Sequence, residues 1–257
     1  PGFALRRTST GEILRRIPGG MNVPDVQQAL DQLRMEGYRY VLIQPLFLTP
    51  GEEFDQLKAQ AAPFSADGFS LAVGAPLLDT PEDCTALSRA LLNSLEPPRP
   101  DEALVLMGHG SLHHSNGEFL RMEQALRTEG RPDAFVGVMR GEPGLDRVLA
   151  AVHRRPHVRA VQLHPLLITA GMHARRDLAG SGDASWRTRL EAAGYPVRCT
   201  LRGLGEYPAV RRLFVHHALA AGARAHFPCA VSGGGDTRAP DGAEAPLSFP
   251  NREAPLL

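Results

Sequence analysis

The feature that most constrains the fold is a stretch of sequence that occurs twice, 120 residues apart. Residues 39–53 and 159–173 are identical at six of fifteen positions, and these positions carry Arg, Val, Pro, Leu, Thr and Gly. Each copy follows a segment with apolar residues at helical spacing after a proline, in residues 23–37 and 142–156. A helix, a strand and a glycine turn thus occur in order in each half. This order predicts parallel strands with helical crossovers, an α/β fold built from two similar halves.

Apolar patterns trace the second half from end to end. Ser185 is expected to cap one of its helices, which then ends at Gly194. Strands are predicted at 103–111, 134–139 and 159–168, helices at 116–129, 144–153, 185–194 and 207–224, and a last strand with its turn at 196–205.

The two halves give a domain division. Residues 95–100 read Leu-Glu-Pro-Pro-Arg-Pro and predict a connector, so the halves are expected to span 1–98 and 99–227. The partner of the strand at 103–111 would precede the first residue of the sequence, and the first half is therefore predicted to be incomplete, without its first strand. Residues 228–257 are rich in Gly, Pro, Ala and Ser and predict a disordered tail.

Composition narrows the classes of function. The chain has 257 residues and 43% apolar content, which suffices for a sizeable core. Its 28 basic and 28 acidic residues give no net charge, so no global field favours nucleic acid or a membrane surface as a partner. Three widely separated cysteines indicate neither a disulfide framework nor a thiolate metal site, and a reducing, cytoplasmic location is expected.

Polar residues follow three of the predicted strands where the strands end. In open α/β sheets, ligands bind at the carboxyl ends of the strands. His109 lies there between two glycines, His173 follows the third strand of the second half, and Glu53 occupies the position of His173 in the first half. Two imidazoles and a carboxylate suit a divalent metal, held more loosely than by thiolates and with a coordination position left open.

The other histidines have simpler explanations. His164 lies in the middle of a strand and is predicted to be a core residue, whereas one of His216 and His217 should be buried in a helix and the other exposed. His113 and His114 are expected to form an exposed loop pair that binds no metal. A hydrolase is disfavoured, because the Gly-His-Gly-Ser sequence lacks the G-x-S-x-G nucleophile elbow.

Several motifs resemble those of a known family. They are MGHGS with Asn116 after it, LHPLLITAGMHARRDLAGSGDASWRTRLEAAGYPV, LRGLGEYPAVRRLFVHH and, in the first half, VQQALDQLRMEGYRYVLIQPLFLTPGEEFD. Over roughly residues 5–225 the chain resembles anaerobic sirohydrochlorin cobaltochelatases, which are class II tetrapyrrole chelatases. The resemblance implies two similar Rossmann-like parallel-sheet domains facing a central cleft.

The resemblance also implies a reaction. It is the insertion of Co²⁺ into sirohydrochlorin during anaerobic cobalamin (vitamin B12) biosynthesis, with cobalt as the substrate metal and no organic cofactor. By motif, His109 and His173 would bind the metal, His109 would accept a proton, and Glu53 would line the same cleft.

Because sirohydrochlorin carries many carboxylates, cationic or N–H-rich walls are expected around it. The candidates are Ser111, Arg175, Arg176 and Arg202.

One departure from the family bears on activity. The family has a metal-binding glutamate before G-x-P, where this chain has Arg140, and a guanidinium cannot ligate a cation. Glu142, two residues further on, is not placed there by the motif. Two other readings therefore remain open: an iron or nickel chelatase for a related tetrapyrrole, and a non-catalytic tetrapyrrole- or metal-binding descendant. The sequence also leaves homo-oligomerisation open.

Overall fold

A computed structural model of the chain describes residues 24–66, 70–97, 99–112 and 116–227. The described residues belong to one compact unit that ends at Phe227. The predicted tail at 228–257 and the predicted loop pair His113 and His114 lie outside the described residues. Among the helices within the described ranges, none has the length and apolar content that crossing a bilayer requires.

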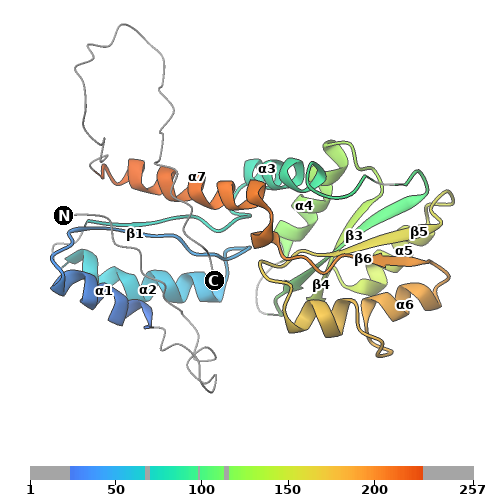
Figure 1. Cartoon of the computed structure of the whole chain (residues 1–257), viewed down its shortest axis with the longest axis horizontal. Coiled ribbons are helices and arrows are strands. Elements are labelled where there is room, and N and C mark those ends of the chain that lie inside the picture. The colour runs from blue at the N-terminus through green and yellow to red at the C-terminus, as the bar shows by residue number, and fades with distance from the viewer. Residues whose placement is uncertain (1–23, 67–69, 98, 113–115, 228–257) are drawn as a thin grey trace, which may run out of the picture. The chain divides into compact units, whose positions relative to one another are not determined.

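A four-stranded parallel sheet forms the larger part of the fold, in the order β4-β3-β5-β6 (Figure 1). Its strands are β3 (Glu102–Gly110), β4 (Ala134–Arg140), β5 (Ala160–Pro165) and β6 (Val197–Cys199). The strands predicted at 103–111 and 134–139 are confirmed, and the strand predicted at 159–168 is present but ends at Pro165. The strand and turn predicted at 196–205 are also confirmed, because the chain turns away after Cys199 and the amides of Leu204 and Gly205 donate to the segment that follows β5.

Helices cover both faces of this sheet (Figure 1). One face packs against α3 (Pro81–Leu92) and α4 (Gly117–Thr128), and the other against α5 (Leu145–His153) and α6 (Trp186–Ala192). The predicted cap of α6 is confirmed, because the Ser185 hydroxyl accepts a hydrogen bond from the Thr188 amide. The α/β class predicted from the sequence is therefore confirmed.

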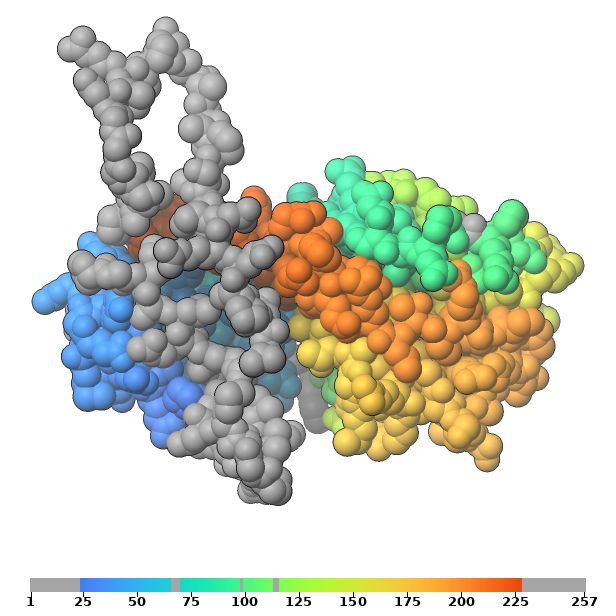
Figure 2. All heavy atoms as spheres, viewed as in Figure 1, coloured from blue at the N-terminus to red at the C-terminus, as the bar shows by residue number. Residues whose placement is uncertain are grey.

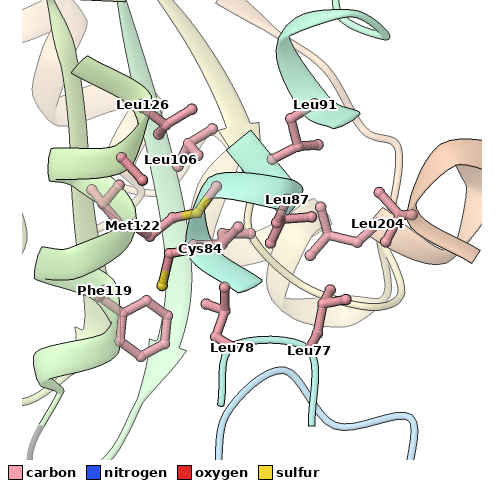
Figure 3. Packing of buried hydrophobic residues seen from close by; sticks show 14 of the residues in the cluster. Leu77, Leu78, Cys84, Leu87, Leu91, Leu106, Phe119, Met122, Leu126 and Leu204 are labelled. Atoms are coloured by element: carbon pink, nitrogen blue, oxygen red, sulfur yellow. The ribbon is translucent and has the colours of Figure 1, made fainter. Parts of the chain in front are cut away.

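The first of these faces holds the largest apolar cluster (Figure 3). It combines α3 and α4 with the residues of β3 that point to the same side. Full burial of each leucine side chain contributes about 1.5–3 kcal/mol to folding. Its fully buried members include Leu77, Leu78, Leu87, Leu91, Leu106, Met122, Leu126 and Leu204.

A second, two-stranded parallel sheet lies earlier in the chain. Its elements are α1 (Val26–Met35), β1 (Tyr40–Ile43), α2 (Glu52–Ala66) and β2 (Ser70–Val73). The sequence reasoning anticipated α1 and β1 but did not identify α2, β2 or α3. The prediction that the first half lacks its first strand stays a prediction.

The two copies of the sequence repeat make the same local bonds. The Gln44 amide donates to the Pro45 carbonyl, and the His164 ring pairs in the same way with the Pro165 carbonyl. The amides of Leu77 and Leu78 donate to the segment after β1, as those of Leu204 and Gly205 donate to the segment after β5. The predicted similarity of the two halves therefore extends from sequence to hydrogen bonding.

Two helices depart from a simple division of the chain into halves. α3 precedes the predicted connector yet packs on the four-stranded sheet. α7 (Pro208–Arg224) packs beside α3 and also contacts β1 and β2, and Figure 2 shows the spheres of α3 and α7 side by side. In α7, His217 is buried while His216 is exposed, as predicted. The domain boundary at residue 98 stays a prediction.

His164 occupies a fully buried position in β5, as the sequence predicted. Its Nδ1 lies 2.8 Å from the Pro165 carbonyl oxygen and its Nε2 lies 2.7 Å from the Tyr207 hydroxyl. Because a carbonyl oxygen only accepts, Nδ1 carries the proton and Nε2 accepts from Tyr207. Burial lowers the pKa of His164 to about 4, since it penalises the charged form.

We expect folding stability to fall as the pH drops from about 6.5 to about 4. In this range the unfolded chain protonates residue 164 while the folded chain does not, and the full loss is about 3 kcal/mol. Urea unfolding across this range, with NMR titration of the His164 ring, would measure it. His164→Gln, which copies Gln44 of the other repeat, should lack this part of the pH dependence. Protonation of His164 near pH 6.5 in the folded protein would contradict the prediction.

Candidate functional site

His109 is the next-to-last residue of β3 and lies between two glycines that close packing requires. A Cβ on Gly108 would come within 2.2 Å of the Phe119 ring, and one on Gly110 within 2.3 Å of the Arg140 carbonyl oxygen. Gly110 also has a φ of +71°, which disfavours other residues. The two glycines therefore let neighbouring elements approach β3 closely, and this fixes the exposed His109 at the strand end.

Asn116 fastens the loop after His109 to the end of β4. Its Oδ1 accepts a hydrogen bond from the Ser111 amide at 2.9 Å. Its Nδ2 lies 3.1, 3.2 and 2.9 Å from the carbonyl oxygens of Ser111, Arg140 and Glu142. Since Asn116 is 8% exposed, these bonds form largely away from water and hold the two loops in one geometry.

His173 lies beyond the end of β5, at the start of a turn of π-helix, η2 (Ala174–Leu178). Ala174 and Leu178 are fully buried and anchor this turn, while the His173 side chain is 42% exposed. π-helical turns are rare and frequently occur at functional sites. The turn presents His173 outward from a fixed base.

The structure brings His109 and His173 together. Their ring centroids are 5.2 Å apart and the ring planes are inclined by 75°. This separation suits two imidazoles that share one ion through bonds of about 2 Å. The pairing of these two predicted site residues follows from the hydrogen bonding of β3 with β5, which places both strand ends side by side.

Hydrogen bonds fix which ring nitrogen of each histidine is available. His109 Nδ1 lies 3.0 Å from the Gly110 carbonyl oxygen, and His173 Nδ1 lies 2.7 Å from Asp177 Oδ2. Both partners are acceptors, so each Nδ1 donates its proton and each Nε2 keeps a lone pair. Two Nε2 atoms with lone pairs are able to bind a divalent cation or to accept a proton.

Asp177 orients His173 and is itself held by Arg176. The Arg176 guanidinium donates to both carboxylate oxygens, at 2.7 and 3.1 Å. These bonds are the main reason that the pKa of Asp177 lies below its ordinary value; partial burial opposes them, and the bond from His173 adds to them. A carboxylate behind a metal-binding histidine fixes the ring and raises its basicity.

Glu53 is placed separately from this pair. It is exposed in the first turn of α2. Within the described ranges, no three or more His, Cys, Asp or Glu side chains gather as a group able to hold a metal ion. The structure thus assembles the two histidines of the predicted ligand set, and a role for Glu53 stays a prediction.

The predicted substrate-binding residues follow the strands β3, β5 and β6 in the chain. Arg175 is exposed in η2, and Arg176 is engaged with Asp177. The Arg202 guanidinium lies 4.2 Å from the centre of the Tyr207 ring and donates to the Glu206 carbonyl. The Ser111 backbone is bonded to Asn116. Substrate contacts by these four residues stay predictions.

Arg140 and Glu142 flank the turn after β4. Arg140 is exposed and pairs in register with Gly110 of β3. Glu142 turns back to accept a hydrogen bond from the Gly144 amide at 2.7 Å. Glu142 thus closes its own turn.

Sequence reasoning did not assign a role to Asp177 or to Asn116. For Asp177 a signal existed, since it follows His173 by four residues and such pairs lie on one side of a helix. For Asn116 no local signal existed, because its three carbonyl partners come from two separate loops.

Comparison with known proteins gives a consistent picture. A sequence profile of the family described as "Cobalt chelatase (CbiK)" matches residues 4–222. A protein of Salmonella typhimurium named sirohydrochlorin cobaltochelatase is 33% identical over 215 residues, which cover 83% of this chain and 81% of that protein. A protein of Nitratidesulfovibrio vulgaris named sirohydrochlorin cobaltochelatase CbiKC is 36% identical over 226 residues, covering 86% of this chain and 79% of that protein.

Solved structures agree on the fold. SirB from Bacillus subtilis with Fe³⁺ aligns with a TM-score of 0.57 at 14% identity and covers 79% of this chain and 81% of its own. The sirohydrochlorin chelatase SirB from Bacillus subtilis subspecies spizizenii in complex with cobalt aligns with a TM-score of 0.53 at 14% identity, covering 79% and 78%. At this identity the two structures show a shared fold, and they confirm the fold class that the resemblance implied.

Replacement of Asp177 by asparagine is expected to weaken binding of Co²⁺ about 10- to 100-fold, because the negative charge behind His173 is lost. Isothermal titration calorimetry with Co²⁺ alone measures this change. Asp146→Asn is the matched control, since Asp146 is an exposed carboxylate paired with Arg189. Equal Co²⁺ affinity in Asp177→Asn and the unchanged protein would show that Asp177 does not support the metal ligand.

Asn116→Asp should lower the free energy of unfolding by about 1–3 kcal/mol, because a carboxylate cannot donate hydrogen bonds to the carbonyl oxygens that accept from the Asn116 Nδ2 group. Urea denaturation at pH 7 gives the value. Asn93→Asp alters an exposed asparagine after α3 and should cost less than about 1 kcal/mol. If both variants lose the same small amount, the bonds of Asn116 do not hold the loops.

Proposed function

The chain belongs to the cobalt chelatase (CbiK) family, and we propose that it inserts Co²⁺ into sirohydrochlorin. The reaction is that of a lyase forming nitrogen–metal bonds, placed in anaerobic cobalamin biosynthesis. The observation that carries the proposal is the pair of imidazoles, His109 and His173. Their ring centroids are 5.2 Å apart, and the Nε2 lone pair of each ring is available.

Metal insertion exchanges two protons for one cation. The free macrocycle releases two N–H protons as Co²⁺ enters and binds the pyrrole nitrogens. A neutral imidazole serves either task near pH 7, as ligand to the incoming ion or as acceptor of a released proton. Within this scheme, both histidines present Co²⁺ to one face of the macrocycle.

The bonds of the two rings suggest a division of roles. His173 is backed by the Asp177 carboxylate, which favours its function as a lasting metal ligand. His109 is backed by a neutral carbonyl, and its exposure leaves it accessible to the macrocycle, so we assign to its Nε2 the acceptance of one of the two pyrrole protons, after Co²⁺ has left that lone pair for the pyrrole nitrogens. Glu53 remains our candidate for helping ligation or proton removal.

Positive charge near the strand ends suits the carboxylates of sirohydrochlorin. We assign contacts with these carboxylates to Arg175 and Arg202, with the Ser111 backbone as a further donor. Arg176 is the weakest candidate, because Asp177 already occupies its guanidinium. Sirohydrochlorin is then the small-molecule partner, and a cytoplasmic location, favoured by the cysteine pattern, forms part of the proposal.

A second function is favoured by one observation. The described residues gather two imidazoles without a third donor, and Arg140 stands where the family carries a glutamate. A descendant that binds tetrapyrrole or metal without turnover would share both features. An activity assay separates this alternative from the chelatase.

His109→Ala and His173→Ala are each expected to lower enzyme-dependent cobalt insertion at least about 100-fold, because a ligand or a proton acceptor is removed. Absorbance follows the conversion of sirohydrochlorin after subtraction of the rate without protein. His157→Ala is the matched control, since His157 also pairs with an aspartate, Asp133, and is 54% exposed.

Two results would count against the proposal. Cobalt insertion at the normal rate by His109→Ala and His173→Ala would show that the imidazole pair is not the site. Tight tetrapyrrole binding without any turnover by the unchanged protein would favour the non-catalytic alternative.

A further inference from the structure

A small pocket with both polar and apolar walls includes His173. Its volume is about 250 Å³. The segment that follows β5 supplies its walls, and the imidazole of His173 forms one of them. The lining residues are Leu167, Ile168, Thr169, Gly171, Met172 and His173.

Each of the paired histidines has a large exposed apolar neighbour in the chain. Met172 immediately precedes His173 and is 71% exposed, and Leu112 follows His109 by three residues and is 72% exposed. The buried Ala174 and Leu178 already anchor the turn that carries His173. Packing within the fold therefore does not explain why large apolar side chains occupy positions 172 and 112.

The same pattern occurs after other strands. Leu46 follows β1 and is 60% exposed, and Leu201 follows β6 and is 48% exposed. Single exposed apolar residues are ordinary, but these residues all follow the carboxyl ends of parallel strands, where ligands bind in open α/β sheets.

Cationic side chains accompany these apolar ones. Arg175 is exposed two residues after His173, and Arg202 lies over the Tyr207 ring next to Leu201. An apolar surface with positive charge beside it complements a ligand that is flat and apolar in the middle and carries carboxylates at its rim. The tetrapyrrole of the proposed reaction has this chemistry.

We propose that Met172 and Leu112 form an apolar platform that contacts the face of the macrocycle and holds it over the two imidazoles. This inference rests on the proposed function. It assigns to the platform the affinity for the macrocycle, and leaves the affinity for the metal to His109 and His173. The flexible, polarisable methionine side chain follows the face of a ring that distorts as the metal enters.

The test separates macrocycle binding from metal binding. Met172→Gln keeps side-chain length and Leu112→Gln extends it by one atom, and both remove apolar contact; each should raise KM for sirohydrochlorin about 5- to 50-fold at saturating Co²⁺. The value of kcat should change less than about twofold, and the Kd for Co²⁺ without macrocycle should stay the same. Met172→Leu should retain the original KM.

Met35→Gln is the matched control, because Met35 is a methionine that is 81% exposed in α1 and is distant in sequence from both His109 and His173. It should leave KM unchanged. An unchanged KM in both Met172→Gln and Leu112→Gln, or a loss of Co²⁺ affinity in either, would overturn the platform while leaving the chelatase function intact. If the unchanged protein neither converts nor binds sirohydrochlorin, the proposed function fails, and the platform fails with it.

Discussion

The parallel pairing of β3 with β5 is the constraint on which the site depends. Met107 lies opposite Pro165, and the pairing continues as the Leu166 amide donates to the Met107 carbonyl. His109 stands two residues beyond Met107, so it emerges at the edge where the segment after β5 begins. Residues that are 64 positions apart in sequence thereby bring their rings into contact. A shift in this register would separate them, since each residue of slip moves a strand by about 3.3 Å.

Around this pairing, the fold supports each histidine through a different device. On the His109 side, two glycines admit Phe119 and the end of β4, and Asn116 ties the adjoining loops through backbone carbonyls. On the His173 side, a buried turn of π-helix carries the ring, and a carboxylate held by Arg176 bonds to it. The ring of His109 is thus held by a neutral carbonyl and the ring of His173 by a carboxylate.

Much of this architecture was readable from the sequence because it rests on local signals. Long apolar runs predicted β3 and β5, and the repeat predicted two similar halves with parallel strands. Ser185 predicted the start of α6. β1 and β2 are equally short, but β1 lies within the sequence repeat and β2 lies outside it, so only β1 was found. α2 was missed because its apolar periodicity is weak and it contains Pro63. The strand-end rule found His109 and His173. It did not supply the contacts of Asn116 or the π-helical turn, since both depend on how separate loops pack.

Within the part of the chain that the structure describes, no group of three or more His, Cys, Asp or Glu side chains forms around the two histidines, and this is consistent with transfer of a metal. A chelatase must give up its ion to the pyrrole nitrogens, so tight binding by the protein would oppose the reaction. Two neutral imidazoles hold a divalent ion less firmly than a set that includes thiolates or several carboxylates, and they leave coordination positions for the macrocycle. Arg140 stands at the end of β4, opposite Gly110 of the strand that carries His109. The apolar platform that we propose would supply affinity for the macrocycle through Met172 and Leu112, without strengthening the hold on the ion.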